Sequence, residues 1–444
     1  MNISINEIIS AYKKGKLTLV EVKKKLQELN GPLPKYSLSE GQKGLWALQK
    51  TFPEMAAYNV PLCFRILDLD VDMFKKASQF LMKQHPILNS VIKEDNGTPY
   101  QIMQSVQDNV FQHKDLSGIE SDQIQSYLNQ KAKQPFRLEK GPLLRVHLFS
   151  LSNQETIVLI NIHHIIFDGN SALILMKTLF DAYHDLIDGK ELIFISLPAT
   201  YNDFVKEEQK MVKGKEGESR LLYWKKQMAG TLPILSLPTD RPRSSSQNHF
   251  EGKTCSHTIS SELSERIKLF SKEQKAYLST LFMGLFKVLL HKYTGQRDII
   301  VGMPVNERNQ QHFNQMIGFL INMVPMRSEI SSNESLLVFL NKLQNTILSG
   351  MACSYPFSAL VRELNLSTVT GSVPVFQVAF LYQDFLTGMD SRELPIQIVE
   401  GIHQEGEYEI VLEVIEQKKG FLLSWKYNPE LFDEATIVRM MDHY

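Results

Sequence analysis

The stretch that most constrains the fold lies at residues 157–171, where a short apolar segment leads into two adjacent histidines, His163 and His164. The apolar segment is rich in β-branched residues, which predicts a buried strand. After it, apolar residues recur at helical spacing, at Leu175, Leu179 and Tyr183. That period predicts a helix. We therefore expect both histidines at the end of a strand and Asp168 in the turn that opens the helix, where rigid elements present side chains at a surface.

The length of 444 residues exceeds what one compact core usually holds and favours two lobes. Strands and helices are interleaved along the chain, which predicts an α/β sandwich rather than an all-helical fold. In the first lobe, residues 34–205, the patterns predict strands at 58–66 and 144–148 and a helix at 71–85.

The second lobe, residues 251–444, contains a strong helical stripe at 278–289 and a buried strand at 298–303. Between the lobes we expect a connector at 206–250, because the sequence around Met211 is rich in Lys, Glu and Gly. Residues 237–246 are rich in Pro, Ser and charge, which predicts an extended connection on the surface.

Residues 1–33 are distinct from both lobes. Thr18 and Glu21 form a capping-box pattern at the start of a short amphipathic helix. We expect this segment to be a linker or a docking element, although it could also pack on the main body. The chain stops within the helical pattern that begins at Leu431, which predicts a domain taken from a longer protein.

Charge and cysteine content exclude several function classes. The 48 basic and 49 acidic residues give a net charge of −1, which offers no electrostatic case for nucleic acid or an anionic membrane. No segment is long and apolar enough to be a membrane span or a standard secretory signal. Cys63, Cys255 and Cys353 are far apart, so we expect neither a zinc site nor a disulfide framework, but reduced thiols in the cytoplasm.

The central stretch suits acyl-transfer chemistry. If His164 projects into a cleft, its neutral imidazole can accept a proton from an amine or hydroxyl, or hold that group in place. It can also stabilise the charge that develops as a thioester carbonyl becomes tetrahedral. Asp168 would organise the site and would be satisfied best by a buried arginine. Gly169 gives the turn room and lets a substrate approach closely.

Two other interpretations of the same residues are available. An HxxxD pattern alone is short, and for an arbitrary example a hydrogen-bonded structural pair is the simpler interpretation. A metal site would need another ligand, but no carboxylate or third histidine stands at helical spacing to complete one. The complete sequence HHIIFDG, between a predicted strand and a predicted helix, is a considerably more specific motif than HxxxD alone.

Further motifs follow in a fixed order on both sides of the central stretch, at residues 38–46, 83–90, 135–136, 141–145, 163–169, 201–204, 223–224, 237–243, 301–304 with Arg308, 317–322 and 374–378. Together they resemble the condensation domains of nonribosomal peptide synthetases, within the HHxxxDG acyltransferase superfamily. The resemblance covers about residue 36 to the end of the chain. It departs at Ala352, near the place of a histidine that many members carry, and at 367–372, which replace an arginine-rich segment. These departures bear on substrate or carrier preference.

The resemblance implies two chloramphenicol-acetyltransferase-like lobes in a V shape with a central tunnel. By position in the motif, His164 would act on the substrate, as a base or as a positioning group. His163 and Asp168 would shape the site, and Asp168 would pair with Arg308 from the other lobe. Gly169 would keep the tunnel open.

The resemblance also implies a reaction and its partners. An acyl group would pass from the thioester of an upstream donor carrier protein to the amine of a downstream aminoacyl carrier protein. Both substrates would ride on phosphopantetheine, with no cofactor or metal bound to the domain itself. An adenylation domain would lie beside it in the full-length protein. Asn322 would line the tunnel or form hydrogen bonds at a strand end. Residues 1–33 resemble linkers of mixed polyketide/peptide assembly lines, which is compatible with a polyketide donor.

Two other functions are compatible with the sequence. The first is an ester-forming acyltransferase of the same superfamily. The second is a carrier-binding platform without catalysis. Degenerate members usually lose residues of the central motif, and residues 163–169 are intact here.

Overall fold

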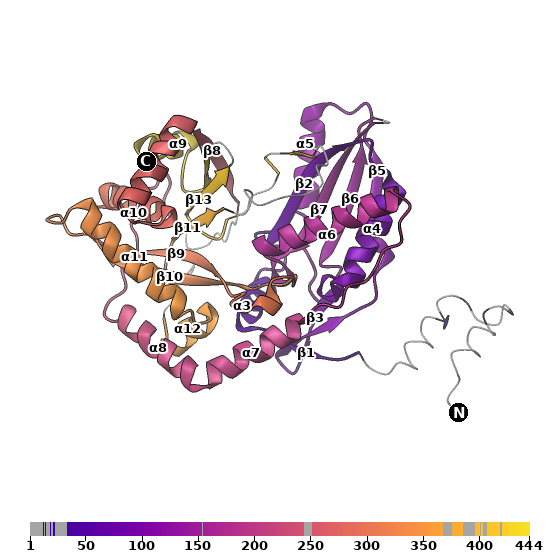
Figure 1. Ribbon diagram of the computed structural model, residues 1–444, viewed down its shortest axis with the longest axis horizontal. Coiled ribbons are helices and arrows are strands. Elements are labelled where there is room, and N and C mark those ends of the chain that lie inside the picture. The colour runs from indigo at the N-terminus through magenta and orange to yellow at the C-terminus, as the bar shows by residue number, and fades with distance from the viewer. Residues whose placement is uncertain are drawn as a thin grey trace.

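The computed structural model describes residues 12, 14, 18, 21–22, 33–152, 154–243, 251–366, 375–384, 396–399, 401–402, 406–417 and 420–444. Over these residues two lobes diverge from a shared base in a V outline, the first in indigo and purple and the second in red to yellow (Figure 1). Each lobe is built on a mixed β-sheet with flanking helices, which confirms the expected α/β class. The central tunnel stays a prediction.

The first lobe is organised on a five-stranded sheet whose central strand, β7, is Glu155–His163. The strand order is β12-β2-β7-β6-β5, with β12 at Ile396–Ile398, β2 at Asn59–Leu67, β6 at Leu144–Ser150 and β5 at Phe111–Asp115. Neighbouring strands are antiparallel except for β5 and β6. The strands expected at 58–66 and 144–148 and before the histidines are therefore found, with small shifts at their ends.

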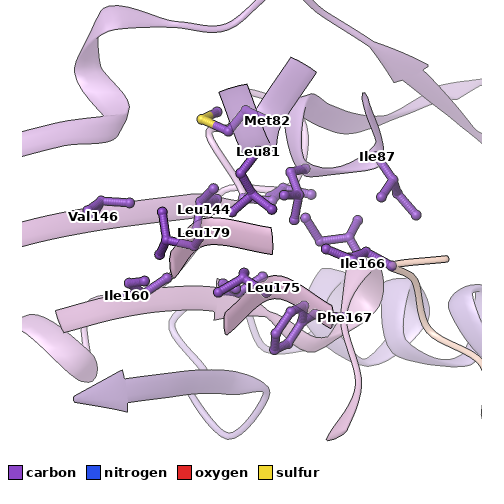
Figure 2. Packing of buried hydrophobic residues seen from close by; sticks show 14 of the residues in the cluster. Leu81, Met82, Ile87, Leu144, Val146, Ile160, Ile166, Phe167, Leu175 and Leu179 are labelled. Carbon is purple, nitrogen blue, oxygen red and sulfur yellow. The ribbon is translucent and has the colours of Figure 1, made fainter. Parts of the chain in front are cut away.

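Strand β7 is buried on both faces, which explains its nearly continuous apolar sequence. The helices that cover the sheet are α4 (Val71–Gln84), α5 (Ser121–Ala132) and α6 (Gly169–Ile187). Val158, Ile160 and Ile162 belong to the core under α4 and α6, where side chains of β6, β7 and both helices meet (Figure 2). Ile157 and Leu159 belong to a smaller core with α5. Core packing on both sides holds the strand end that carries the histidines.

Helix α3 and a small sheet complete the base of the first lobe. Their bounds, with two short 3-10 helices, are α3 Glu40–Thr51, β1 Tyr36–Ser37, β3 Ser90–Asp95, β4 Thr98–Met103, η1 Pro86–Asn89 and η2 Asp108–Val110. Ser39 caps α3, and its hydroxyl and the Gln42 side chain form a capping box. Gln42 also reaches the central stretch, because its Nε2 donates to the carbonyl of Ile165 at 2.9 Å.

The second lobe is built on a six-stranded sheet in the order β10-β9-β11-β13-β14-β8. The strands are β8 Lys253–Ile259, β9 Asp298–Asn306, β10 Ile321–Glu329, β11 Val378–Gln383, β13 Ile410–Gln417 and β14 Gly420–Tyr427. Its helices are α9 Ser261–Glu273, α10 Leu278–Thr294, α11 Leu336–Ala352, α12 Phe357–Glu363 and α13 Glu434–His443, with the 3-10 helix η4 at Gln311–Phe313. Helix α10 contains the predicted stripe at 278–289.

The first half of the predicted connector is helical. Helices α7 (Tyr201–Lys213) and α8 (Lys215–Gln227) run along the base of the V from the first lobe to the second (Figure 1). The expectation of an extended surface connection at 237–246 is wrong at its start, because Leu237 is buried in the core of the second lobe. The sequence did not identify Leu237 as a core residue, because it stands alone in a Pro- and Ser-rich segment and a single apolar residue shows no periodicity. Residues 244–250 lie outside the described part of the chain, and the limits 206–250 stay a prediction.

The second half of the chain contributes to the first lobe at two places. Strand β12, from the second half of the chain, pairs antiparallel with β2 of the first-lobe sheet. Phe313, Met316, Ile317 and Leu320 also come from the second half, yet they belong to the hydrophobic core of the first lobe. These two contributions hold the second half of the chain against the first lobe.

Two other sequence expectations can be compared with the described residues. The capping box near the N-terminus is present, because Thr18 N–H donates to Glu21 Oε2 at 2.8 Å and Glu21 N–H donates to Thr18 Oγ1 at 3.3 Å. Most of residues 1–33, and the departure at 367–372, lie outside the described ranges. Among the described helices, none has an apolar run of the length that crossing a membrane requires.

Candidate active site

Local hydrogen bonds fix the turn after β7. The strand ends at His163, the 3-10 helix η3 (His164–Ile166) follows, and Asp168 caps α6 through a bond from the Ser171 N–H to its Oδ1 at 2.8 Å. The His164 N–H donates to the Tyr58 carbonyl at 2.8 Å. Asp168 is thus the N-cap residue of α6, as its place in the turn before the helix predicts.

His163 is a buried structural residue. Its Nδ1 accepts a hydrogen bond from the Ile165 N–H at 3.0 Å, and its Nε2 lies 3.3 Å from Gln49 Oε1. An acceptor at Nδ1 and a donor at Nε2 describe one neutral tautomer. Burial lowers the pKa of His163 to about 3, with smaller contributions from His164 and Arg145. Both ring nitrogens are therefore occupied, and the side chain supports the turn rather than a substrate.

His164 is different, because its ring is only half-buried. Its Nδ1 is buried without a well-formed hydrogen bond, which leaves Nε2 as the nitrogen that can meet a substrate. Burial lowers the pKa of His164 below its ordinary value, while the Asp168 carboxylate and nearby backbone groups of His164 and Phe167 act in the opposite direction. The imidazole is therefore neutral at pH 7 and able to accept a proton or a hydrogen bond.

Asp168 and Arg308 form a buried ion pair between the lobes, which confirms the predicted pairing. Arg308 Nη1 donates to Asp168 Oδ2 at 2.8 Å, and Arg308 Nη2 donates to Asp168 Oδ1 at 2.9 Å. The Arg308 side chain is 2% exposed and the Asp168 side chain is 0% exposed. Two parallel bonds of this kind match the planar guanidinium to the carboxylate.

Ser171 joins the same network, and we refer to Asp168, Ser171 and Arg308 as the clasp. The Ser171 Oγ lies 2.7 Å from Asp168 Oδ1 and 3.0 Å from Arg308 Nη2. From the other lobe, the Gly318 N–H donates to Ser171 Oγ at 3.0 Å, and the Leu320 N–H donates to Asp168 Oδ2 at 2.8 Å. Each oxygen of the buried carboxylate thus accepts at least two hydrogen bonds, as a desolvated charge requires.

Gly169 follows Asp168, is exposed and begins α6. A Cβ built at this position would have no heavy atom within 4 Å. Its backbone is not in the left-handed region, so the fold does not require glycine here. What glycine provides is open space at the start of α6.

Asn322 lies on β10 and is occupied by hydrogen bonds within the second lobe. Its Nδ2 donates to Ser354 Oγ at 2.9 Å and to the Tyr355 carbonyl at 2.8 Å, and its Oδ1 accepts from the Phe357 N–H at 2.8 Å. Asn322 also lines a cavity, so both of its predicted roles are compatible with its position.

That cavity has a volume of about 670 Å³ and lies between helices α7 and α8 and the second lobe. Its lining includes Gly41 and Phe319, together with two carboxyl groups whose pKa is raised by burial, Glu208 to about 7 and Glu307. His164 is not a lining residue, but Phe319 contacts both, since its ring is 5.3 Å from the His164 ring between centroids. The cavity therefore adjoins the site rather than containing it.

The structure brings together His163, His164, Asp168, Gly169 and Arg308, and places Asn322 on the cavity wall. It adds two residues that sequence reasoning did not single out, Ser171 and Phe319. Ser171 lies in the first turn of a predicted helix, three residues after the cap, and that spacing could have indicated it. Phe319 belongs to the motif at 317–322, but nothing in the sequence indicated its contact with His164. Among the described residues, no cluster of His, Cys, Asp or Glu is arranged to hold a metal ion.

A family model for the condensation domain matches residues 34–444. The polyketide synthase PksN of Bacillus subtilis (strain 168) is 46% identical over 419 residues, which are 92% of this chain and 8% of that protein. A linear gramicidin synthase protein of Brevibacillus parabrevis is 35% identical over 418 residues, 92% of this chain and 5% of that protein. The chain thus spans less than a tenth of the length of these two curated relatives.

Solved structures share the fold. A four-domain nonribosomal peptide synthetase, holo-AB3403 bound to AMP and glycine, superposes with a TM-score of 0.82 at 21% identity, over 92% of this chain and 32% of that one. The first condensation domain of the calcium-dependent antibiotic synthetase, in complex with a substrate analogue, gives 0.78 at 19% identity, over 92% and 94%.

The clasp generates a stability prediction. Asp168→Ala leaves the Arg308 guanidinium buried without its counter-charge, which should lower the free energy of unfolding by about 3–5 kcal/mol. The matched control is Asp181→Ala on the same helix, which breaks an exposed pair with Lys177 and should cost less than about 1 kcal/mol. Denaturant unfolding measures both. Equal losses in the two variants would show that the clasp contributes no special stability.

Proposed function

Because this chain belongs to the condensation-domain family, we propose that it catalyses amide-bond formation between two carrier-bound substrates. The donor is an acyl thioester and the acceptor is the amine of an aminoacyl thioester, each on the phosphopantetheine arm of a carrier protein. The similarity to a polyketide synthase and to a linear gramicidin synthase supports a place in a peptide or hybrid polyketide–peptide synthetase. A neighbouring adenylation domain and a cytoplasmic location belong to the same proposal.

The observation that carries the proposal is the state of His164. It is a neutral, half-buried imidazole at the end of a rigid strand, with one buried nitrogen, and five residues later in the chain Gly169 leaves open space at the start of α6. An amine that attacks a thioester becomes acidic as its C–N bond forms. A neutral imidazole can hold the amine before attack and take its proton afterwards, while the C–S bond breaks and the donor thiol leaves.

The clasp supports this role without touching the substrate. It is charge-neutral and saturated with hydrogen bonds, so Asp168 is not available as a proton acceptor. His163 is also excluded, because both of its ring nitrogens are engaged. His164 is therefore the titratable group of the motif that is free to act. An intact and accessible His164 also favours catalysis over a carrier-binding platform.

His164→Ala should reduce acyl transfer by a factor of about 10² to 10⁴, the range that general acid–base catalysis contributes. Donor and acceptor carriers are loaded with a panel of acyl and aminoacyl groups, and the fastest pair is followed by intact-mass analysis. His257→Ala, at an exposed position on β8, is the control and should transfer at the normal rate. Undiminished transfer by a folded His164→Ala variant would refute the catalytic assignment.

The pH dependence of transfer should reflect the lowered pKa of His164. The acceptor amine has a pKa of about 8, so the logarithm of the rate falls with a slope of one below that pH. His164 stays neutral until the pH drops below its ordinary pKa, and only there should the slope increase to two. A slope of about 1.5 already at pH 6.5, the ordinary pKa of a histidine, would mean that burial does not lower the pKa of His164. The measurement is the initial transfer rate with subsaturating acceptor carrier.

Gly169→Ala should separate access from folding. The added methyl group meets no protein atom within 4 Å, and alanine is at least as good a helix former as glycine. Thermal stability should therefore be unchanged or slightly higher, while transfer decreases because the methyl occupies the open space at the start of α6. Full activity in this variant would show that no substrate passes close to Gly169.

A further inference from the structure

The His164 ring has an aromatic partner whose role the motif does not explain. The Phe319 ring lies at 89° to the imidazole, with 5.3 Å between the ring centroids. This edge-to-face arrangement is one of the favoured geometries for two rings. Backbone groups of His164 and Phe167 interact with the imidazole, but its buried Nδ1 has no hydrogen bond of good geometry, so packing also contributes to fixing the rotation of the ring.

The backbone of Phe319 is held firmly between the lobes. Its carbonyl accepts a hydrogen bond from the Tyr201 hydroxyl at 2.9 Å. The residues on either side of it, Gly318 and Leu320, donate their N–H groups to Ser171 and Asp168 of the clasp. The ion pair therefore determines, through two neighbouring peptide bonds, where the Phe319 ring meets His164.

Gly41 provides the space that the Phe319 ring occupies. A Cβ on Gly41 would lie 2.7 Å from Cε1 and 3.2 Å from Cδ1 of Phe319, closer than side chains tolerate. Gly41 lies near the start of α3, where its backbone is helical and does not itself require glycine. The reason for a glycine here is the aromatic ring.

We propose that Phe319 is a positioning residue that fixes the orientation of the His164 imidazole, and that Gly41 is required because it makes room for the Phe319 ring. The inference rests on the proposed function of His164. It assigns Phe319 no contact with the reacting atoms. The Phe319 ring acts through His164: it packs against the imidazole and so keeps Nε2 oriented towards the substrate.

Three variants test this proposal. Phe319→Leu removes the ring, and Gly41→Ala forces the ring to turn without altering it. Each should lower kcat by roughly one to two orders of magnitude, the effect of misplacing a catalytic group by about 1 Å, with little change in the KM for the acceptor carrier. The double variant Gly41→Ala/Phe319→Leu should be no slower than Phe319→Leu alone, because a branched aliphatic side chain leaves room for the added methyl. Gly44→Ala is the control on the same helix, since its Cβ would meet only Ser358 at an ordinary 3.4 Å.

A spectroscopic signal distinguishes positioning from a general loss of structure. In protein with isotope-labelled histidine, the ring carbon–proton resonance of His164 is identified by its absence in His164→Ala. Because the ring current of Phe319 acts on it, this resonance should shift in Phe319→Leu and Gly41→Ala and stay in place in Gly44→Ala. The other histidine resonances serve as the internal standard for an intact fold.

The proposal is overturned if Gly41→Ala keeps full kcat and an unshifted His164 resonance, or if the losses of the two single variants multiply in the double variant. Should Phe319→Leu fail to fold, Gly41→Ala alone decides between the two results. These outcomes are distinct from a failure of the proposed function, which would appear as normal transfer by His164→Ala. In that case the resonance shifts would still report whether Phe319 orients the ring.

Discussion

The buried ion pair between Asp168 and Arg308 is the interaction on which the site depends. Removing both charges from water carries a large desolvation cost, which is tolerable only because every oxygen of the carboxylate is hydrogen-bonded and the guanidinium is met in a bidentate manner. The pair also spans the two halves of the chain. It is therefore better suited to holding one relative placement of the lobes than to adding stability in itself.

The ion pair also positions residues that lie close to it in the sequence, on both lobes. Asp168 caps α6 and so sets the turn that carries His164, four residues earlier. On the other lobe, its bond from Leu320 and that of Ser171 from Gly318 place Phe319 against the imidazole. Four apolar residues near Phe319 complete the core of the first lobe. One electrostatic contact thus aligns a strand end, a helix start and an aromatic ring around a neutral histidine.

The sequence was most informative where local pattern and chemistry coincide. A β-branched run followed by helical spacing predicted β7 and α6, and the family resemblance indicated Arg308 as the partner of Asp168. Features that depend on distant contacts gave no local signal: β12 is three residues long and pairs with a strand more than three hundred residues away, and Leu237 is one buried side chain in a polar run. Phe319 looks like any core aromatic until its partner is known.

The central claim is that this arrangement forms an amide between carrier-bound substrates, and the most direct test is the identity of the product. Unaltered domain is incubated with acyl-loaded donor and aminoacyl-loaded acceptor carriers, and the acceptor is analysed by intact mass before and after base releases its cargo. The account predicts that the acceptor gains the mass of the acyl group and releases an N-acyl amino acid. An unchanged acceptor mass across the panel of loaded carriers, or release of the free amino acid alone, would contradict it.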